Sequence, residues 1–205
     1  MTDKLKSYYK RLYQNYGRKA QAVQHTSYSE QCKRFEVLCE LLEPKDSVID
    51  LGCGLGHMLE YLREIGHEGL YLGLDFVSEF IESNKKNFID DDSAQFNLFD
   101  LNMQRIPRGY DQLIVCGVFN NIMEDNEKFM KALLLKMYSA AEKAVSFNMM
   151  STYVEFFDEN LHYFDPINIF DFCKKELSPL VSLRHDYALG SKAFPYEFTI
   201  HVKKV

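Results

Sequence analysis

An aspartate and three closely spaced glycines form a cluster of potential ligand-binding residues, Asp50-Leu51-Gly52-Cys53-Gly54-Leu55-Gly56. Residues 47–51 are predicted to form a short buried strand, so the glycines follow its carboxyl end, where parallel sheets bind ligands. Glycine there lets the backbone turn tightly and approach a ligand closely. The dinucleotide pattern G-x-G-x-x-G is not matched, because His57 stands at the third glycine position, and no Gly-Lys-Ser/Thr follows as in a P-loop.

The elements that must position this loop alternate between strand and helix. Strands are predicted at 47–51, 70–75, 94–99, 111–117 and 143–149, and two more, 180–187 and 196–205, follow one another near the end of the chain. Such alternation predicts a parallel sheet with helices on both faces, and the last pair predicts an antiparallel edge. The expected fold class is α/β: a three-layer, Rossmann-like sandwich around a seven-stranded, mostly parallel sheet with one antiparallel strand, plus N-terminal helices.

Two units are expected along the chain. Residues 1–44 form an N-terminal helical lid or cap segment, in which apolar and tyrosine residues recur at helical spacing between Leu5 and Tyr16. Ser27 and Glu30 have the spacing of a capping box and predict the start of a second helix. Residues 45–205 form the Rossmann-like ligand-binding domain. The tyrosine-bearing helix precedes this domain, so it either closes over the site or merely packs against it.

The glycine loop and its flanks resemble a known family. The stretch VIDLGCGLGHMLEYL, residues 48–62, followed by GLYLGLD, residues 69–75, resembles the first motifs of the class I S-adenosylmethionine methyltransferases. The resemblance is strongest over roughly residues 45–150, and the order of strands and helices extends it to the rest of the chain. It implies S-adenosylmethionine as cofactor, S-adenosylhomocysteine as product, and a methyltransferase as the enzyme.

The resemblance also implies roles for the residues of the glycine loop. Gly52, Gly54 and Gly56, with Cys53 between them, would surround the methionine part of S-adenosylmethionine. Asp50 would hold that loop, or would reach the amino group of the ligand through water.

Residues at the ends of the next strands receive further roles by the same resemblance. Asp75 would accept hydrogen bonds from both ribose hydroxyls, which suits the two oxygens of a carboxylate. Phe76 would pack on the adenine. Asp100 would accept from the adenine amino group, with Leu101 beside it, and Cys116–Gly117 would line the side of the sulfonium.

Candidate catalytic residues lie beyond the fourth predicted strand, because a hydroxyl or ammonium acceptor must lose a proton. His185 and Tyr187 alternate on one predicted strand and therefore share a face. Glu197, on the neighbouring strand, could orient His185. If His185 faces the packing of the sheet instead, Tyr163 or Asp165 becomes the better candidate.

Composition and charge restrict the acceptor. The net charge of the 205 residues is −6, which disfavours nucleic acid and anionic membranes as partners. The fourth strand is followed by Cys116-Gly117-Val118-Phe119-Asn120-Asn121, without the paired prolines of base-modifying methyltransferases. We therefore expect methyl transfer to an oxygen or nitrogen atom of a small molecule. The first 40 residues carry a net charge of +4, which would suit an anionic substrate unless these charges only form the exposed faces of helices.

Other features bear on cofactors and localisation. The five cysteines are widely spread, with no Cys-x-x-Cys pair, so neither a disulfide framework nor a metal site is expected. No apolar run approaches the length of a spanning helix and the first residues lack a signal sequence, so a soluble, cytoplasmic protein is expected.

Two further functions stay open. The same fold could support a lyase or cyclase that uses S-adenosylmethionine without methylating an acceptor and releases methylthioadenosine. It could also serve as a non-catalytic regulatory module that binds S-adenosylmethionine. The sequence does not define the acceptor, the methylated atom or the oligomeric state.

Overall fold

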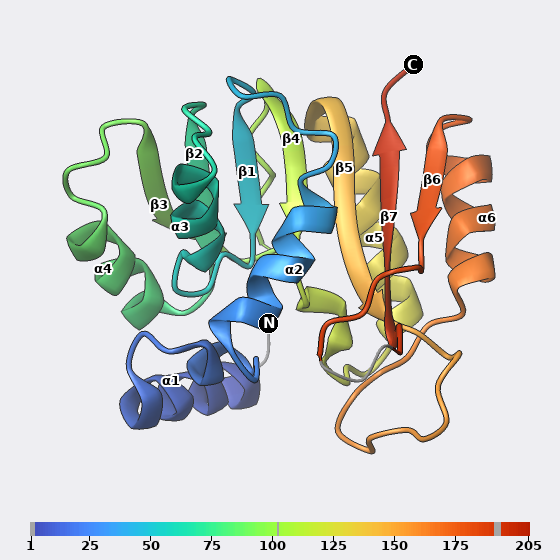
Figure 1. Cartoon of the computed structure of the whole chain (residues 1–205), viewed down its shortest axis with the longest axis horizontal. Helices are drawn as coiled ribbons and strands as arrows, with labels where there is room; N and C mark the ends of the chain where they lie inside the picture. The colour runs from blue at the N-terminus through green and yellow to red at the C-terminus, as the bar shows by residue number, and fades with distance from the viewer. Residues whose placement is uncertain (1–2, 102, 191–193) are drawn as a thin grey trace.

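Seven strands form a single mixed sheet in the computed structural model of the chain, which describes residues 3–101, 103–190 and 194–205 (Figure 1). The strand order is β3-β2-β1-β4-β5-β7-β6. The elements are α1 Asp3–Tyr16, the 3-10 helix η1 Ala20–Val23, α2 Tyr28–Leu38, β1 Val48–Leu51, α3 His57–Glu64, β2 Tyr71–Asp75, α4 Ser78–Asn87, β3 Ala94–Leu98, β4 Tyr110–Val115, the 3-10 helix η2 Val118–Asn120, α5 Asn126–Ala140, β5 Ala141–Met150, α6 Pro166–Glu176, β6 Val181–Arg184 and β7 Glu197–Lys203.

The sheet confirms the expected fold class. β3, β2, β1, β4 and β5 pair in parallel, whereas β7 is antiparallel to both of its neighbours, β5 and β6. β1 lies between β2 and β4, so the strand order reverses there and a crevice opens at the carboxyl ends of β1 and β4. All four residues of β1 are buried, as expected for a central parallel strand with helices on both faces.

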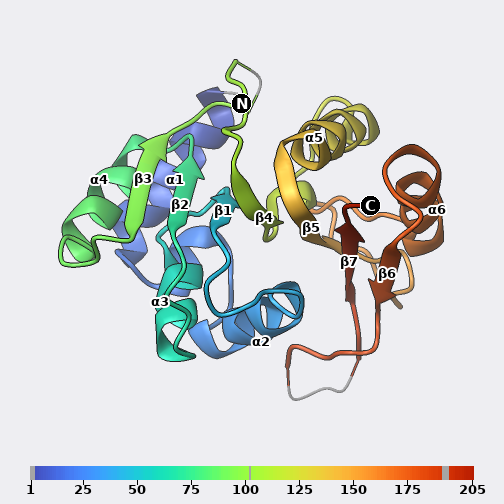
Figure 2. The same cartoon turned by 90° about the horizontal axis from the view of Figure 1, so that it is seen from above.

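Helices cover both faces of the sheet (Figure 2). On one face, Leu38 of α2 and Met58 and Leu62 of α3 share a core with Val48 of β1. On the other face, residues of α5 and α6 share a core with β4, β5 and β7. α2 thus belongs to a helical layer of the sandwich, and the predicted division of the chain at residue 44 stays a prediction.

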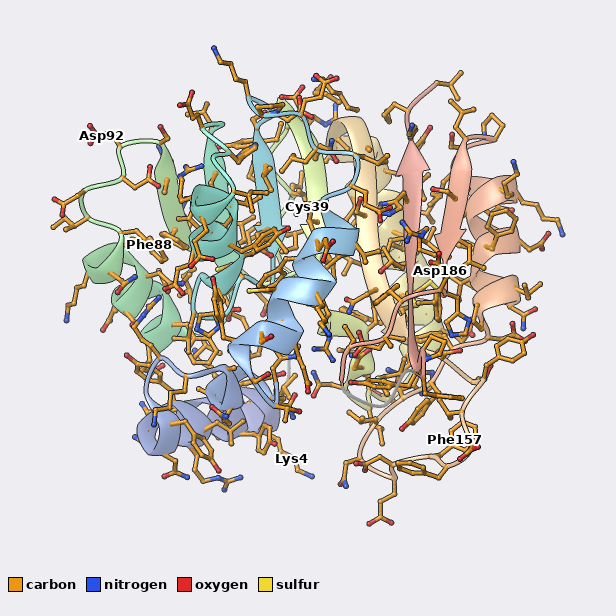
Figure 3. The ribbon with its side chains drawn as sticks, viewed as in Figure 1. Lys4, Cys39, Phe88, Asp92, Phe157 and Asp186 are labelled. Carbon is orange, nitrogen blue, oxygen red and sulfur yellow. The ribbon has the colours of Figure 1, made fainter. Side chains whose placement is uncertain are left out.

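The N-terminal segment before α2 lies across the carboxyl ends of the parallel strands (Figure 1). α1 ends before Gly17, whose N–H donates to the Tyr13 carbonyl, and η1 follows after a short turn. Ser27 then caps α2 by accepting a hydrogen bond from the Glu30 N–H at 3.2 Å, as its capping-box spacing predicts. Lys4 of α1 and Phe157 of the long loop after β5 lie at this same end of the molecule, and Asp92 lies at the opposite end (Figure 3).

Two predicted strands near the end of the chain are shorter than expected. β6 ends at Arg184, so His185 and Tyr187 lie in the loop that follows rather than on one face of a strand. β7 begins at Glu197. Among the described residues, no helix has both the length and the apolar character required to cross a membrane.

Candidate active site

A cavity of about 280 Å³ lies at the carboxyl ends of β1, β2 and β4, beneath the N-terminal segment. Of the predicted cofactor-binding residues, it is lined by Asp50, Gly52, Cys53, Gly54, Asp75, Phe76, Leu101, Cys116 and Gly117. Of the predicted catalytic residues only Glu197 lines it. Residues from α1, η1 and α2 complete the wall, so the cavity is closed partly by the segment that precedes the sandwich.

The glycine loop needs its glycines for conformation and for close packing. Gly54 has φ +52°, and a Cβ on it would lie 2.9 Å from the Val23 side chain of η1. Gly56 has φ +74°, but a Cβ there would meet Phe88, 2.7 Å away, and Gly56 does not line the cavity. Gly54 thus brings the N-terminal segment close to the loop, whereas Gly56 lets α3 pack against α4.

Asp75 stands at the end of β2 and organises the loop. Its Oδ2 accepts a hydrogen bond from the Gly54 N–H and its Oδ1 accepts one from the Val77 N–H, each at 2.9 Å. Burial raises the pKa of Asp75 to about 6, against the lowering effect of these backbone donors. Each carboxylate oxygen can accept a second hydrogen bond, so Asp75 retains capacity for a pair of ligand hydroxyls.

Asp50 is buried beside the loop and paired. Its Oδ2 accepts a hydrogen bond from the Tyr71 hydroxyl at 2.6 Å. Burial raises the pKa of Asp50 to about 7, the Tyr71 hydroxyl lowers it, and the neighbouring Asp75 raises it. Two close carboxylates in a buried site favour a cationic ligand, because a positive charge between them offsets their repulsion.

The end of the cavity beside β2 and β3 is aromatic and apolar. Phe76 and Phe80 each lie with their ring centroids 6.1 Å from that of Tyr9 in α1, and Phe99 and Leu101 complete this end. Asp100 does not line the cavity. Its N–H donates to Gln104 Oε1 at 2.8 Å, in a turn after β3. This end of the cavity therefore has the apolar, aromatic lining on which an aromatic base can pack.

The end of the cavity beside β5 and β7 is polar. Arg34 of α2 donates to both carboxylate oxygens of Glu197, with a shortest N–O distance of 2.7 Å, and both side chains are buried. Asn148 Nδ2 donates to Glu197 at 2.8 Å, and its Oδ1 accepts from the Gly117 N–H at 2.8 Å. This network fixes the backbone after β4 relative to α2 and β7. Because each charge is buried with its partner, removal of either would leave the other uncompensated.

The expected pairing of His185 with Glu197 is not present. Glu197 is held by Arg34, and His185 Nε2 contacts the Pro195 carbonyl oxygen at 3.0 Å. The Tyr187 hydroxyl shares a hydrogen bond with Thr199 Oγ1 at 2.8 Å. The strand predicted for 180–187 ends too early to carry these side chains to the cavity, and neither His185 nor Tyr187 lines it.

Tyr163 and Asp165 also lie away from the cavity lining. The Tyr163 hydroxyl accepts a hydrogen bond from the Asp158 N–H at 2.9 Å within the long loop after β5. Asp165 caps α6 by accepting from the Ile167 N–H at 2.8 Å and the Asn168 N–H at 3.3 Å. Both side chains thus have structural partners, and the structure does not bring them together with the glycine loop.

Two cavity residues on the N-terminal side had no clear signal in the sequence. Gln31 of α2 is only 3% exposed, and its Oε1 has no hydrogen-bond partner in the part of the chain that the structure describes. His25, between η1 and α2, faces the backbone after β4: a Cβ on Gly117 would lie 3.9 Å from His25 Cε1 and 4.0 Å from Nε2. Gln31 is indistinguishable in sequence from any polar helical residue, and His25 stands in a predicted loop.

Three of the eight Lys and Arg side chains in the first 40 residues are shown paired with carboxylates of the chain. Arg18 lies 3.0 Å from Glu60, Lys10 lies 2.5 Å from Glu79, and Arg34 is bound to Glu197. The part of the chain that the structure describes contains no group of three or more His, Cys, Asp or Glu side chains placed to hold a metal ion.

Comparison with known proteins agrees with this geometry. A family model described as a methyltransferase domain matches residues 49–141. A protein of Mycobacterium tuberculosis (strain ATCC 25618 / H37Rv) named "Putative methyltransferase Rv1506c" is 34% identical over 164 residues, which cover 77% of this chain and 93% of that protein.

Solved structures share the fold. Magnesium protoporphyrin IX methyltransferase (ChlM) from Synechocystis PCC 6803 with bound SAH superposes with a TM-score of 0.66 at 15% identity, covering 99% of this chain and 95% of that chain. The DhpI–SAH complex gives a TM-score of 0.67 at 14% identity, with 96% and 93% coverage. Together with the family match and the more similar relative, they show that the chain belongs to the methyltransferases, as an enzyme of the class I, S-adenosylmethionine-dependent type.

Proposed function

We propose that this methyltransferase acts on an oxygen or nitrogen atom of a small-molecule acceptor. The observation that carries the proposal is the cavity: at about 280 Å³ it lies just below the range of about 300–1,000 Å³ that is typical of small-molecule sites, and α1 and η1 close part of it. The cofactor would take up most of a cavity of this size, so an acceptor that enters beside it has to be compact, or has to be one part of a larger molecule.

The residues present fit S-adenosylmethionine. Asp75 would hold the ribose hydroxyls, Phe76 and Leu101 would flank the adenine, and Gly52–Gly54 would pass beside the methionine part. The Gln31 amide is buried, faces the cavity and has an unpaired oxygen, which suits the charged amino-acid end of the cofactor. An amide presents both a donor and an acceptor, so one side chain can serve a carboxylate or an ammonium group.

The chain's part in the reaction is chiefly to orient the reactants and to exclude water. When bound, S-adenosylmethionine supplies an activated methyl group on a sulfonium. Cys116 and Gly117, held in place through Asn148, form the wall that the methyl group would face. Tyr9 donates to Gln24 Oε1 at 2.9 Å and accepts from Asn121 Nδ2 at 3.1 Å, so α1 is tied to both sides of the cavity mouth. Such closure aligns the reacting groups and keeps water away.

Two measurements test the proposal. Calorimetry should show micromolar or tighter binding of S-adenosylhomocysteine, about −8 kcal/mol, and no binding of NAD. Incubation with S-adenosylmethionine and a small-molecule extract should yield S-adenosylhomocysteine together with a methylated small molecule. Formation of methylthioadenosine instead would establish the lyase chemistry. Transfer only to protein or nucleic acid added to the assay would contradict the small-molecule acceptor.

A further inference from the structure

His25 occupies the part of the cavity where the acceptor must lie. Its Cε1–Nε2 edge faces Gly117, at the end of β4, next to the wall that the transferred methyl group would face. Within the described residues, the imidazole ring makes no hydrogen bond, whereas the His25 backbone N–H donates to the Ala20 carbonyl of η1 at 3.0 Å. η1 thus holds the backbone of His25, and the ring lines the cavity with its Cε1–Nε2 edge toward Gly117.

The groups around His25 favour its neutral form. Burial, the Arg34 guanidinium of α2 and the His57 imidazole of α3 lower the pKa of His25 to about 3. Glu197 of β7 does not reverse this effect, because its carboxylate is bound to Arg34 and Asn148. A neutral imidazole has one nitrogen with a free lone pair, which can accept a hydrogen bond or a proton.

We propose that His25 is the proton acceptor for methyl transfer and that the acceptor is a hydroxyl compound. The proposal rests on the proposed function and deepens it by naming the base and the class of acceptor. The hydroxyl of the acceptor donates to the His25 ring nitrogen, which places its oxygen beside Gly117 and in line with the methyl group.

The transfer forms one bond and breaks one. A bond forms between the acceptor oxygen and the methyl carbon while the bond between that carbon and the sulfonium sulfur breaks. The electron pair of the broken bond stays on sulfur, and the hydroxyl proton passes to His25, which returns it to solvent when the product leaves. No oxidant, reductant or further co-reactant takes part.

Because His25 is only weakly basic, it favours hydroxyl acceptors over ammonium acceptors. An oxygen that is gaining a methyl group becomes a very strong acid, so even a weakly basic imidazole can take its proton. An alkylammonium, with a pKa near 10.4 for a lysine side chain, holds its proton far more tightly than His25 could. The Arg34 guanidinium beside the ring and the sulfonium of the cofactor also disfavour a third cation at this position.

The test uses the full chain, S-adenosylmethionine with a trideuterated methyl group, and a bacterial small-molecule extract. Mass spectrometry identifies labelled products and assigns the label to oxygen or nitrogen. We expect an O-methyl product, formed about 10²–10⁴-fold more slowly by His25→Phe and by His25→Gln. Glutamine can accept a hydrogen bond but cannot take a proton, so it separates proton transfer from orientation. His162→Gln, a change outside the cavity lining, serves as the matched control.

The outcomes distinguish a role of His25 in proton transfer from a role in cofactor binding. An N-methyl product, or a His25→Gln variant that keeps most of its rate, overturns the assignment of His25 as base. The same holds if either variant loses S-adenosylhomocysteine affinity more than about threefold by calorimetry, since His25 would then serve the cofactor. Absence of any labelled small molecule with the wild-type enzyme contradicts the proposed function itself, and the assignment of His25 falls with it.

Discussion

Asp75 is the residue on which cofactor affinity should depend most directly. Its carboxylate is buried, organises the glycine loop and retains lone pairs for two hydroxyls. Asp75→Ala should weaken S-adenosylhomocysteine binding by about 2–3 kcal/mol, because hydrogen bonds to a charged acceptor are the stronger ones. Affinity should also fall about tenfold per pH unit below pH 6 in the wild type, since burial raises the pKa of Asp75 to about 6 and binding requires the ionised form.

Asp100→Ala is the matched control for Asp75, because Asp100 also follows a strand but does not line the cavity. Calorimetry over pH 5–8 measures both variants. Equal losses in the two variants would show that affinity follows the net charge of the molecule rather than the contact at Asp75. Unchanged affinity in Asp75→Ala would show that Asp75 does not bind the ribose hydroxyls of the cofactor.

Substitution of Gln31 should weaken cofactor binding without lowering the stability of the fold. A buried amide oxygen without a partner lowers stability, so the apolar substitution Gln31→Leu should leave the melting temperature unchanged or higher. If the amide holds the amino-acid end of the cofactor, the same variant should bind S-adenosylhomocysteine at least tenfold more weakly. Binding of methylthioadenosine, which lacks that end, should change less than twofold.

Equal losses for the two ligands would place Gln31 elsewhere than at the amino-acid end. Calorimetry with both ligands and a thermal melt without ligand suffice for this comparison. The sequence does not distinguish an unpaired polar side chain from a paired one. Gln31 and Arg34 lie one turn apart on α2, but only Arg34 of these two has a partner for its polar group in Glu197.

Sequence predicted the lining of the cavity better on the side of the glycine loop than on the side of β7, and the reason is physical. Glycines and strand-end carboxylates act within a few residues of one loop, so their spacing carries the geometry: Gly54 and Asp75 both line the cavity. The side of the cavity beside β7 is assembled from segments far apart in the chain. Arg34 and Glu197 are separated by 163 residues, and only the packing of α2 against β7 brings them together.

At the scale of elements, the N-terminal segment is held to the sandwich chiefly by Arg18. Its guanidinium donates to the Leu55 carbonyl of the glycine loop at 2.6 Å, to Asn84 Oδ1 at 2.9 Å and to Ser83 Oγ at 3.1 Å. The Arg18 carbonyl in turn accepts from His57 Nε2 at 2.7 Å. One residue thus links the segment to the glycine loop, α3 and α4.

Arg18→Met should loosen the segment without unfolding the sandwich. Hydrogen exchange in residues 3–26 should become faster, and S-adenosylhomocysteine should slow it less than in the wild type, where ligand binding is expected to protect this segment. Arg11→Met is the control, because Arg11 is exposed and lies over the ring of Tyr8 within the same helix. Exchange that does not respond to ligand in the wild type would show that the segment packs but does not act as a lid.

The elements themselves were largely predictable, and the exceptions share a cause. Strong local signals set α1, α2 and α6: helical periodicity, the Ser27 cap, and Asp165 before Pro166. The strand predicted for 180–187 stops at Arg184, opposite Thr199, whereas β7 continues to Glu197 in its pairing with β5. The length over which an edge strand pairs depends on its tertiary contacts and is not encoded in the residues of the strand alone.

At the scale of the whole molecule, His201 should make a contribution to stability that is lost in mild acid. It lies on β7, is 1% exposed, and pairs its Nδ1 with Ser146 Oγ at 2.8 Å. Among the described residues its Nε2 has no hydrogen-bond partner, and Glu40 Oε2 lies 3.7 Å away. Burial lowers the pKa of His201 to about 4, as do Arg184 and Lys203, against the raising effect of Glu40. In the unfolded chain the same ring titrates near 6.5.

The sign of the effect follows from proton uptake. Between pH 6.5 and 4 the unfolded chain binds a proton at His201 that the folded chain does not, so acid favours unfolding and stability is lost as the pH falls. The loss attributable to this residue should reach about 2 kcal/mol by pH 5. The raised pKa values of Asp50 and Asp75 act in the opposite direction, because they add protons to the folded state as the pH falls.

A comparison of variants isolates His201 from these opposing groups. Urea unfolding at pH 7.5 and pH 5.0 should show that His201→Gln loses about 2 kcal/mol less stability between the two pH values than the wild type. His185→Gln is the control for the loss of an imidazole, because His185 lies outside the sheet. If His201→Gln keeps the full pH dependence, the acid sensitivity originates in other groups, and the buried ring on β7 does not limit the stability of the sheet.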